Sequence, residues 1–230
     1  MSEFFGSSAY FGFFLTLGSF YLARKLNLRT GSPIFNPILF ATIFCCIVLL
    51  AGNISYETYY IGARHIDMLL TPATICLAIP LYRQYELLKK NIPAILAGIT
   101  AGVVVNILLT ALIMLLFRLD HAAFISMLPR SITSAVGKSL SEELGGNGGI
   151  TIVLILITGI FGAVVAPYIL KLFRIHDPLA QGLAIGTSSH AGGTASAIQM
   201  GDIQGAASSL AIVVASLLSV ILIPLAVSLV

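Results

Sequence analysis

Apolar stretches long enough to cross a lipid bilayer recur along the whole chain. A helix needs about 20 predominantly apolar residues to cross a hydrocarbon core of about 30 Å. Several stretches reach or approach that length and are apolar nearly all round, as expected for helices that face lipid and one another. They predict intact membrane-spanning helices over residues 8–23, 33–52, 92–117, 149–173 and 203–229.

Two further apolar segments contain helix-breaking residues. Residues 67–82 carry Pro72 and Pro80 on either side of Thr74, and residues 178–200 carry four glycines and a run of Ser and Thr. Proline removes a backbone donor, and glycine weakens a helix interior. Backbone that leaves a helix at membrane depth must be buried in protein or line an aqueous cavity. Both segments are therefore predicted to be interrupted spans beside a cavity.

Residues 123–148 predict a third broken element. In this segment Pro129 and Arg130 stand beside the hydroxyls of Ser131 and Thr133. The favoured interpretation is a re-entrant or tip element that dips into the membrane from the outside. An amphipathic hairpin on the membrane surface is the alternative.

The order of these elements predicts an all-α polytopic membrane protein of about seven spans, folded as a single transmembrane domain over residues 1–230. An intact, an interrupted and an intact span follow one another in residues 33–117 and again in residues 149–229. The two triplets would run in opposite directions, a common plan of secondary transporters that places the binding site at the broken helices. Direct similarity between the two stretches of sequence does not support the repeat.

Composition agrees with a membrane protein. Of the 230 residues 58% are hydrophobic and 9% are charged, against about 25% charged in soluble domains, and the mean hydropathy is +1.02. The net charge of +3 comes from short loops, which suits membrane topology rather than nucleic-acid binding. The cysteines lie in apolar segments without ligand spacing, so neither a disulfide framework nor a metal site is predicted. The sequence shows no nucleotide-binding motif, so no cofactor is predicted.

Basic residues predict which side of the membrane is cytoplasmic. If residues 118–148 do not fully cross, eight Lys and Arg residues fall on one side and four on the other. The richer side carries the loops around residues 24–29, 83–90 and 171–174, and should be cytoplasmic. The same crossing pattern places the C-terminus on the cytoplasmic side.

Three sites have the same local pattern, in which Ser or Thr hydroxyls stand beside Pro or Gly where a half-helix could begin. Exposed N–H groups and the positive dipole end of a helix N-terminus attract anions, so a small carboxylate would suit such sites. The expected substrate-binding residues are Asn36, Pro72, Thr74, Arg130, Ser131, Thr133, Ser188, His190, Gly192 and Thr194.

Several of these residues have structural alternatives. His190 could pair with a carboxylate or carry a coupled proton, or its neutral ring could bond a loop carbonyl and hold the bend in shape. Arg130 offers forked donors that match a carboxylate, or it anchors its loop at the headgroups. Asn36 could lend its amide to the cavity or cap the helix that follows.

Catalysis is not expected. Ser188, Ser189, His190 and Asp202 supply the residue types of a hydrolase triad, but no nucleophile-elbow motif accompanies them. Hydroxyls beside a histidine also suit a transport site. The sequence therefore does not predict an enzyme.

Six short motifs follow one another along nearly the full chain. They are Asn36-Pro37, Leu70-Thr71-Pro72-Ala73-Thr74, Ala78-Ile79-Pro80-Leu81-Tyr82, Leu128-Pro129-Arg130-Ser131-Ile132-Thr133, Gly159-Ile160-Phe161-Gly162-Ala163 and Gly186-Thr187-Ser188-Ser189-His190-Ala191-Gly192-Gly193-Thr194-Ala195. Taken in this order, they resemble the LrgB/CidB family. Two positions depart from that family: it usually has Lys where Arg130 stands, and a proline often follows the second hydroxyl, where this chain has Ser134.

The resemblance implies a multi-pass protein of the bacterial inner membrane, often paired with a small holin-like protein of the LrgA/CidA type. It implies a link to murein hydrolase export and autolysis. It also implies transport, because the C-terminal half of the plant plastid glycolate/glycerate transporter is similar. Bacterial relatives are associated with pyruvate, lactate or acetate.

The leading hypothesis is a secondary transporter of small monocarboxylates such as glycolate, lactate or pyruvate, with proton coupling resting on His190. The alternative is a holin-like pore, or a regulator of murein hydrolase export and autolysis, acting with a small LrgA/CidA-type partner. The expected partners are the carboxylate, membrane lipid, that small membrane protein and a second copy of the chain in a homo-oligomer, with no nucleic acid.

Overall fold

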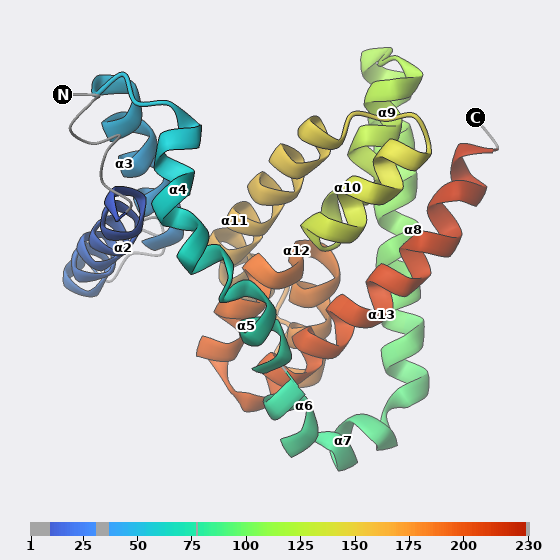
Figure 1. Cartoon of the computed structure of the whole chain (residues 1–230). Coiled ribbons are helices and arrows are strands. Elements are labelled where there is room, and N and C mark those ends of the chain that lie inside the picture. The colour runs from blue at the N-terminus through green and yellow to red at the C-terminus, as the bar shows by residue number, and fades with distance from the viewer. Residues whose placement is uncertain (1–9, 31–36, 77, 229–230) are drawn as a thin grey trace. The chain divides into compact units, whose positions relative to one another are not determined.

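The computed structural model describes residues 10–30, 37–76 and 78–228, and every regular element in these ranges is a helix (Figure 1). The predicted all-α fold class is thereby confirmed. The chain forms two compact units, Met1–Cys76 (unit 1) and Leu77–Val230 (unit 2).

In unit 1, α2 packs against both α3 and α4. A hydrogen bond of 2.7 Å joins Thr16 Oγ1 and Tyr59 Oη, and Ser19 Oγ lies 3.1 Å from Cys45 Sγ. Gly12 lies directly against the backbone of Tyr59, which a side chain at this position would prevent. The helices of this unit are α2 (Phe11–Thr30), α3 (Pro37–Ala51), α4 (Tyr56–Asp67) and α5 (Leu70–Cys76).

Unit 2 is built around α8, α11 and α13. Among the described residues, these are the helices long and apolar enough to cross a membrane. Their bounds agree within two residues with the predicted intact spans. The elements of unit 2 are α6 (Ala78–Arg83), α7 (Tyr85–Lys90), α8 (Ile92–Phe117), α9 (His121–Met127), η2 (Leu128–Ser131), α10 (Ser134–Glu143), α11 (Gly148–Leu172), α12 (Pro178–Met200) and α13 (Asp202–Val227).

The N-terminal helices match the predicted spans less closely. α2 continues through Arg24, Lys25 and Arg29, well beyond the predicted end at residue 23. α3 has 15 residues, which is short for a crossing. The predicted crossing of the membrane by these two helices therefore stays a prediction.

α12 is not a straight helix, because its backbone reverses at His190. His190 has φ 41° and ψ −140° inside an otherwise helical run. Ile185 and Ala197 belong to one buried cluster, although residues twelve apart in a straight helix would lie about 18 Å apart. A Cβ on Gly193 would lie 2.8 Å from Ile185 Cγ2. α12 is therefore a hairpin, with its first arm before His190 and its second arm after it.

Both arms of α12 pack on the first half of α13. Gly186 of the first arm lies against the backbone of Ser208, and Thr194 Oγ1 of the second arm lies 2.7 Å from Ser208 Oγ. Near the base of the hairpin, Gln204 Nε2 donates to Gln181 Oε1 at 3.0 Å. The hairpin thus enters and leaves at the end of unit 2 where α13 begins.

The prediction that residues 178–200 cross the membrane is therefore wrong, although the predicted break within them is confirmed. Gly182 and Gly186 do not break the helix, since each lies where α12 approaches the backbone of α13. Small residues permit such close helix contacts. Hydropathy and glycine content do not distinguish a broken crossing from a hairpin whose two arms begin and end on one side.

The reversal also changes where the C-terminus lies relative to the basic loops. α8 and α13 run in the same direction, because Leu88 clusters with Ala206, and Met114 packs in the cluster that also holds Val227 (Figure 1). The last turn of α13 therefore lies at the opposite end of unit 2 from the basic loops that precede α8 and α12. The predicted cytoplasmic basic loops and the predicted cytoplasmic C-terminus cannot both hold.

α9, η2 and α10 form a second hairpin, which enters from the other end of unit 2. Its tip η2 reaches the middle of α8, where Asn106 Nδ2 donates to the Leu128 carbonyl at 3.0 Å. Its second arm runs back along α11, and Thr151 Oγ1 is hydrogen-bonded to Ser141 Oγ at 2.8 Å. Residues 123–148 are thus re-entrant, in agreement with the favoured interpretation.

The predicted interruption in residues 67–82 stays a prediction, because α5 and α6 are separated only by Leu77, which lies outside the described residues. α5 ends unit 1, and α6, which packs on α13, lies in unit 2. The repeat of residues 33–117 in residues 149–229 stays a prediction. Within unit 2, the two elements of similar form are the hairpins, residues 121–143 and 178–200, which enter from opposite ends.

Gly186→Ala should destabilise unit 2. An added Cβ would lie 2.8 Å from Ser208 Cα and from Ala211 Cβ, with no flexible side chain to give way. Such overpacking costs about 1–3 kcal/mol. Gly98→Ala is the matched control, since nothing lies within 4 Å of its Cβ. The apparent Tm in detergent should fall for Gly186→Ala alone, and an unchanged Tm would contradict the close contact of α12 with α13.

Candidate functional site

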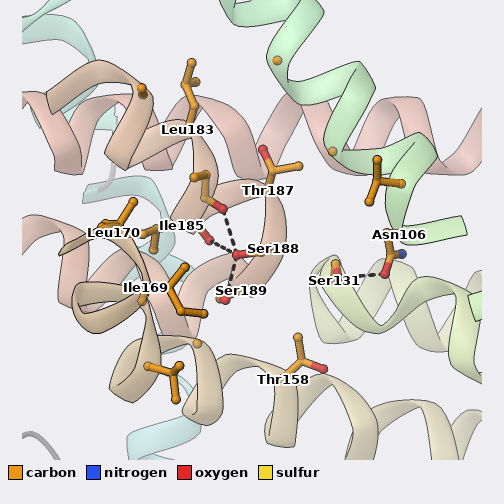
Figure 2. A pocket seen from close by; sticks show the side chains of 18 of the residues that line it. Asn106, Ser131, Thr158, Ile169, Leu170, Leu183, Ile185, Thr187, Ser188 and Ser189 are labelled. Carbon is orange, nitrogen blue, oxygen red and sulfur yellow. Dashed lines mark hydrogen bonds between the residues drawn. The ribbon is translucent and has the colours of Figure 1, made fainter. Parts of the chain in front are cut away.

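A cavity of about 860 Å³ lies in unit 2 between α8, α11, the first arm of α12 and the tip η2. Most of its lining is apolar, and its polar groups come mainly from the two hairpin tips and the middle of α8. Figure 2 shows Asn106 and Ser131 on one side of the cavity and Thr187, Ser188 and Ser189 on the other. The cavity is therefore where the two hairpins face each other.

Ile155 of α11 explains why the two tips meet at one level. Its carbonyl oxygen accepts a hydrogen bond of 2.8 Å from His190 Nε2. Its side chain lies against Gly137 of α10, where a Cβ would come within 2.7 Å of Ile155 Cδ1. Ile155 is fully buried. Both hairpins therefore rest on the same turn of α11.

Arg130 is a half-buried cation on the cavity wall, at the tip η2. Its Nη1 donates to Thr110 Oγ1 at 2.9 Å. Among the described residues, one ion pair is shorter than 4.0 Å: Lys138 Nζ lies 3.9 Å from Glu142 Oε1. Neither residue lines the cavity. The other charged lining residue is Asp177, whose Oδ1 caps α12 at its first turn, far along the chain from the tip. The Arg130 charge thus has no carboxylate partner within the described residues.

Asn106 is a lining residue that the sequence interpretation missed. Its Nδ2 donates to the Leu128 carbonyl, and its Oδ1 accepts from Ser131 Oγ at 3.4 Å. Thr158 of α11 also lines the cavity and was not predicted. A single carboxamide inside the otherwise apolar span at residues 92–117 is the signal that could have identified Asn106.

His190 lies behind the cavity wall and is 7% exposed. A carbonyl can only accept, so the Nε2 that faces Ile155 carries the hydrogen, and Nδ1 is the acceptor for the Gly192 N–H at 3.4 Å. Gly159 of α11 leaves room for the ring, since a Cβ there would lie 2.7 Å from His190 Cε1. This arrangement describes a neutral ring that holds the reversal, which favours the structural alternative for His190.

Gly192 and Thr194 also lie away from the cavity lining. Gly192 presses against the backbone of Gly159, with a Cβ position 2.8 Å from Gly159 Cα. Thr194 Oγ1 donates to the His190 carbonyl at 2.9 Å and is fully enclosed. Both residues contact the reversal itself, and their predicted role in substrate binding stays a prediction.

Ser188 and Ser131 are predicted site residues that do line the cavity. Ser188 Oγ donates to the Ala184 carbonyl at 2.8 Å and lies 3.1 Å from Ser189 Oγ. Thr187, which also lines the cavity, has a buried Oγ1 without a hydrogen-bond partner in the described part of the chain. Buried polar groups are rarely left unpaired, but this oxygen is enclosed by protein, so the cavity does not expose it to a ligand.

Of the remaining predicted residues, Thr133 belongs to unit 2 but is not part of the cavity lining. Thr133 is the N-cap residue of α10 and makes no side-chain cap bond. Pro72 and Thr74 lie in α5 of unit 1. Asn36 lies outside the described residues. Their roles in substrate binding stay predictions.

The cavity extends from the hairpin tips towards one end of unit 2. On α8 its lining runs along one face from Asn91 to Leu109, which is about 27 Å of helix. On α11 it runs from Thr158 to Leu170, and on α12 it includes Asp177. The polar tips thus lie at the inner end of an elongated cavity whose outer end is where α8 and α12 begin.

Cysteine labelling tests the extent of the cavity. In a variant with Cys45, Cys46 and Cys76 replaced by Ser, Gly98→Cys should react with a water-soluble maleimide, because Gly98 lines the cavity and nothing lies within 4 Å of its Cβ. Ile99→Cys is the neighbouring control and should stay unlabelled, since Ile99 is 0% exposed. Equal labelling at the two positions would contradict the cavity.

His190→Ala should lower the stability of the protein. It removes the bond to Ile155, leaves the Gly192 N–H without its acceptor, and keeps a side chain at φ 41°. A buried group left unpaired costs about 1–3 kcal/mol. The apparent Tm in detergent should fall, whereas His121→Ala, which changes an exposed ring, should leave it unchanged. A wild-type Tm for His190→Ala would show that the ring does not hold the reversal.

Comparison with known proteins places the chain in a family. It matches the LrgB-like family over residues 16–229. It is 37% identical over 210 residues to the holin-like protein CidB of Staphylococcus aureus (strain Mu50), covering 91% of this chain and 92% of the relative. It is 36% identical over 224 residues to the antiholin-like protein LrgB of Bacillus subtilis (strain 168), covering 97% of each.

A further Bacillus subtilis relative, the uncharacterized protein YxaC, is 35% identical over 204 residues, or 89% of each chain. No solved structure matches the chain significantly. The family match covers both units and both hairpins, and the three long apolar helices agree with a location in the membrane. The chain is a membrane protein and belongs to the LrgB family.

Proposed function

We propose that the cavity binds a small organic anion, and that the chain is a secondary transporter of small monocarboxylates such as glycolate, lactate or pyruvate. One observation carries this proposal. Arg130, half-buried at a hairpin tip on the cavity wall, has no carboxylate partner among the described residues. A cation deep in a membrane protein is costly unless a counter-charge accompanies it, and intramembrane charges usually mark substrate pathways.

The hairpin tips support the same proposal through their backbone. α10 and the second arm of α12 both begin at a tip, so both helix N-termini point into the middle of unit 2. The positive dipole ends of such half-helices face anionic substrate groups in many secondary transporters. Ser131 and Ser188 add hydroxyl groups on the cavity side. A monocarboxylate would match the single positive charge.

The shape of the cavity agrees with a binding site at the end of an access route. A volume of about 860 Å³ exceeds what a carboxylate of two or three carbons fills. The polar groups are concentrated at the inner end, and the mouth lies where α8 and α12 begin. The substrate would therefore bind at the tips and enter along α8.

A holin-like function is the second candidate, and the relatives' names support it more directly than they support transport. CidB of Staphylococcus aureus is named holin-like, and LrgB of Bacillus subtilis is named antiholin-like. In this proposal the chain forms or regulates a membrane pore, acts with a small LrgA/CidA-type membrane partner and influences murein hydrolase export.

Uptake into proteoliposomes distinguishes the two candidates. Labelled glycolate, lactate and pyruvate are offered with and without a pH gradient, which also tests proton coupling. Saturable uptake of at least one of them is expected from a transporter. Release of a trapped dye that no carboxylate saturates is expected from a pore. Absence of saturable flux for all three would reject the transport proposal.

Arg130→Gln should reduce carboxylate uptake by about tenfold or more, because the substrate loses its charged partner. Arg130→Lys keeps the charge and should retain more activity than Arg130→Gln. Arg118→Gln is the control, since Arg118 is exposed and does not line the cavity. Uptake by Arg130→Gln at the wild-type rate and KM would remove Arg130 from the site.

A further inference from the structure

We propose that Asn106 and Thr110, two residues of α8, are positioning residues that hold Arg130 and Ser131 where the anion binds. The inference rests on the proposed function for its transport readout and on the hydrogen bonds around the tip η2 for its geometry. Thr110 is not part of the cavity lining, so it acts on the anion through Arg130.

The direction of the hydrogen bonds fixes the role of Thr110. Its hydroxyl has a single hydrogen, which it donates to the Asn106 backbone carbonyl at 2.7 Å. The oxygen lone pairs are then free to accept from Arg130 Nη1 at 2.9 Å. Thr110 is 0% exposed, so bulk water does not compete for this acceptor. The guanidinium is thereby fixed to one turn of α8 by one of its five N–H donors.

Asn106 holds the backbone of the same tip. Its amide nitrogen donates to the Leu128 carbonyl at 3.0 Å, and its amide oxygen accepts from Ser131 Oγ at 3.4 Å. These bonds hold the residues on either side of Pro129 and Arg130. Asn106 and Thr110 are one helical turn apart, so a single face of α8 positions the whole tip.

Both positioning groups are neutral, and this matters for the anion. A carboxylate at either position would neutralise the guanidinium internally and compete with a bound anion. A hydroxyl and a carboxamide orient Arg130 and Ser131 while leaving the positive charge uncompensated. α8 therefore orients the residues of the site without adding a charge to it.

Thr110→Val tests the inference, because valine keeps the shape and removes the acceptor. It should raise the KM for the transported monocarboxylate about tenfold while leaving the maximal rate near that of the wild type. Thr110→Ser, which restores the hydroxyl, should recover the wild-type KM. Ser216→Ala is the matched control: it removes a buried hydroxyl that has no partner within the described residues.

A second readout does not depend on transport. Phenylglyoxal modification of Arg130, followed by mass spectrometry of the purified full-length protein, should be several-fold faster in Thr110→Val and return to the wild-type rate in Thr110→Ser. If the wild type shows no uptake, the proposed function fails, and the rate of Arg130 modification alone decides the inference. A rate in Thr110→Val equal to that of the wild type would overturn it.

Asn106→Asp covers the case in which Thr110→Val does not fold. Aspartate keeps the shape and the acceptor for Ser131 Oγ but loses the donor to the Leu128 carbonyl, and the new carboxylate, one turn from Thr110, competes with the anion. Uptake should weaken at least tenfold, mainly through KM. Asn106→Asp with the wild-type KM, or Thr110→Val with unchanged KM and unchanged Arg130 reactivity, would overturn the inference.

Discussion

The architecture of unit 2 depends on satisfying the backbone where α12 reverses. A reversal inside a membrane protein exposes N–H and C=O groups that lipid cannot pair, so protein groups must replace water. His190 Nδ1 does this by accepting from the Gly192 N–H, while Nε2 donates to the Ile155 carbonyl and so ties the reversal to α11. Thr194 then donates to the His190 carbonyl. Without these bonds the two arms of α12 would have no stable turn, and the cavity would lose one of its walls.

α11 is the common support for both hairpins, and small residues make that possible. Gly159 accommodates the His190 ring, and Gly162 lies against Ser189, so the tip of α12 can lie directly on α11. A few residues earlier, Ile155 contacts Gly137 of the opposite hairpin. Close packing of this kind lets both helical hairpins lie directly on α11. The polar groups of their tips are therefore left to face the cavity.

Hydropathy and residue type predict part of this arrangement and do not predict the rest. The apolar length of α8, α11 and α13 determines their bounds, and the glycines around His190 reveal a break. Twenty-three residues can form one crossing or two arms of half the length with the same composition, so the reversal could not be predicted. The pattern singled out Arg130, which lines the cavity, whereas it did not reveal Asn106, whose partners are 22 to 25 residues away in sequence.

The reversal connects the cavity to the distribution of charge. The cavity lining reaches Asn91 and Asp177, at the end of unit 2 that also carries Lys89, Lys90, Lys171 and Arg174. Loops rich in Lys and Arg are usually cytoplasmic, so this end is expected to face the cytoplasm. Cations around a mouth also raise the local concentration of anions. The proposed transport would require the hairpin of α9, η2 and α10 to move, since the buried side chains of Phe124, Ile125 and Leu128 close the other end of unit 2.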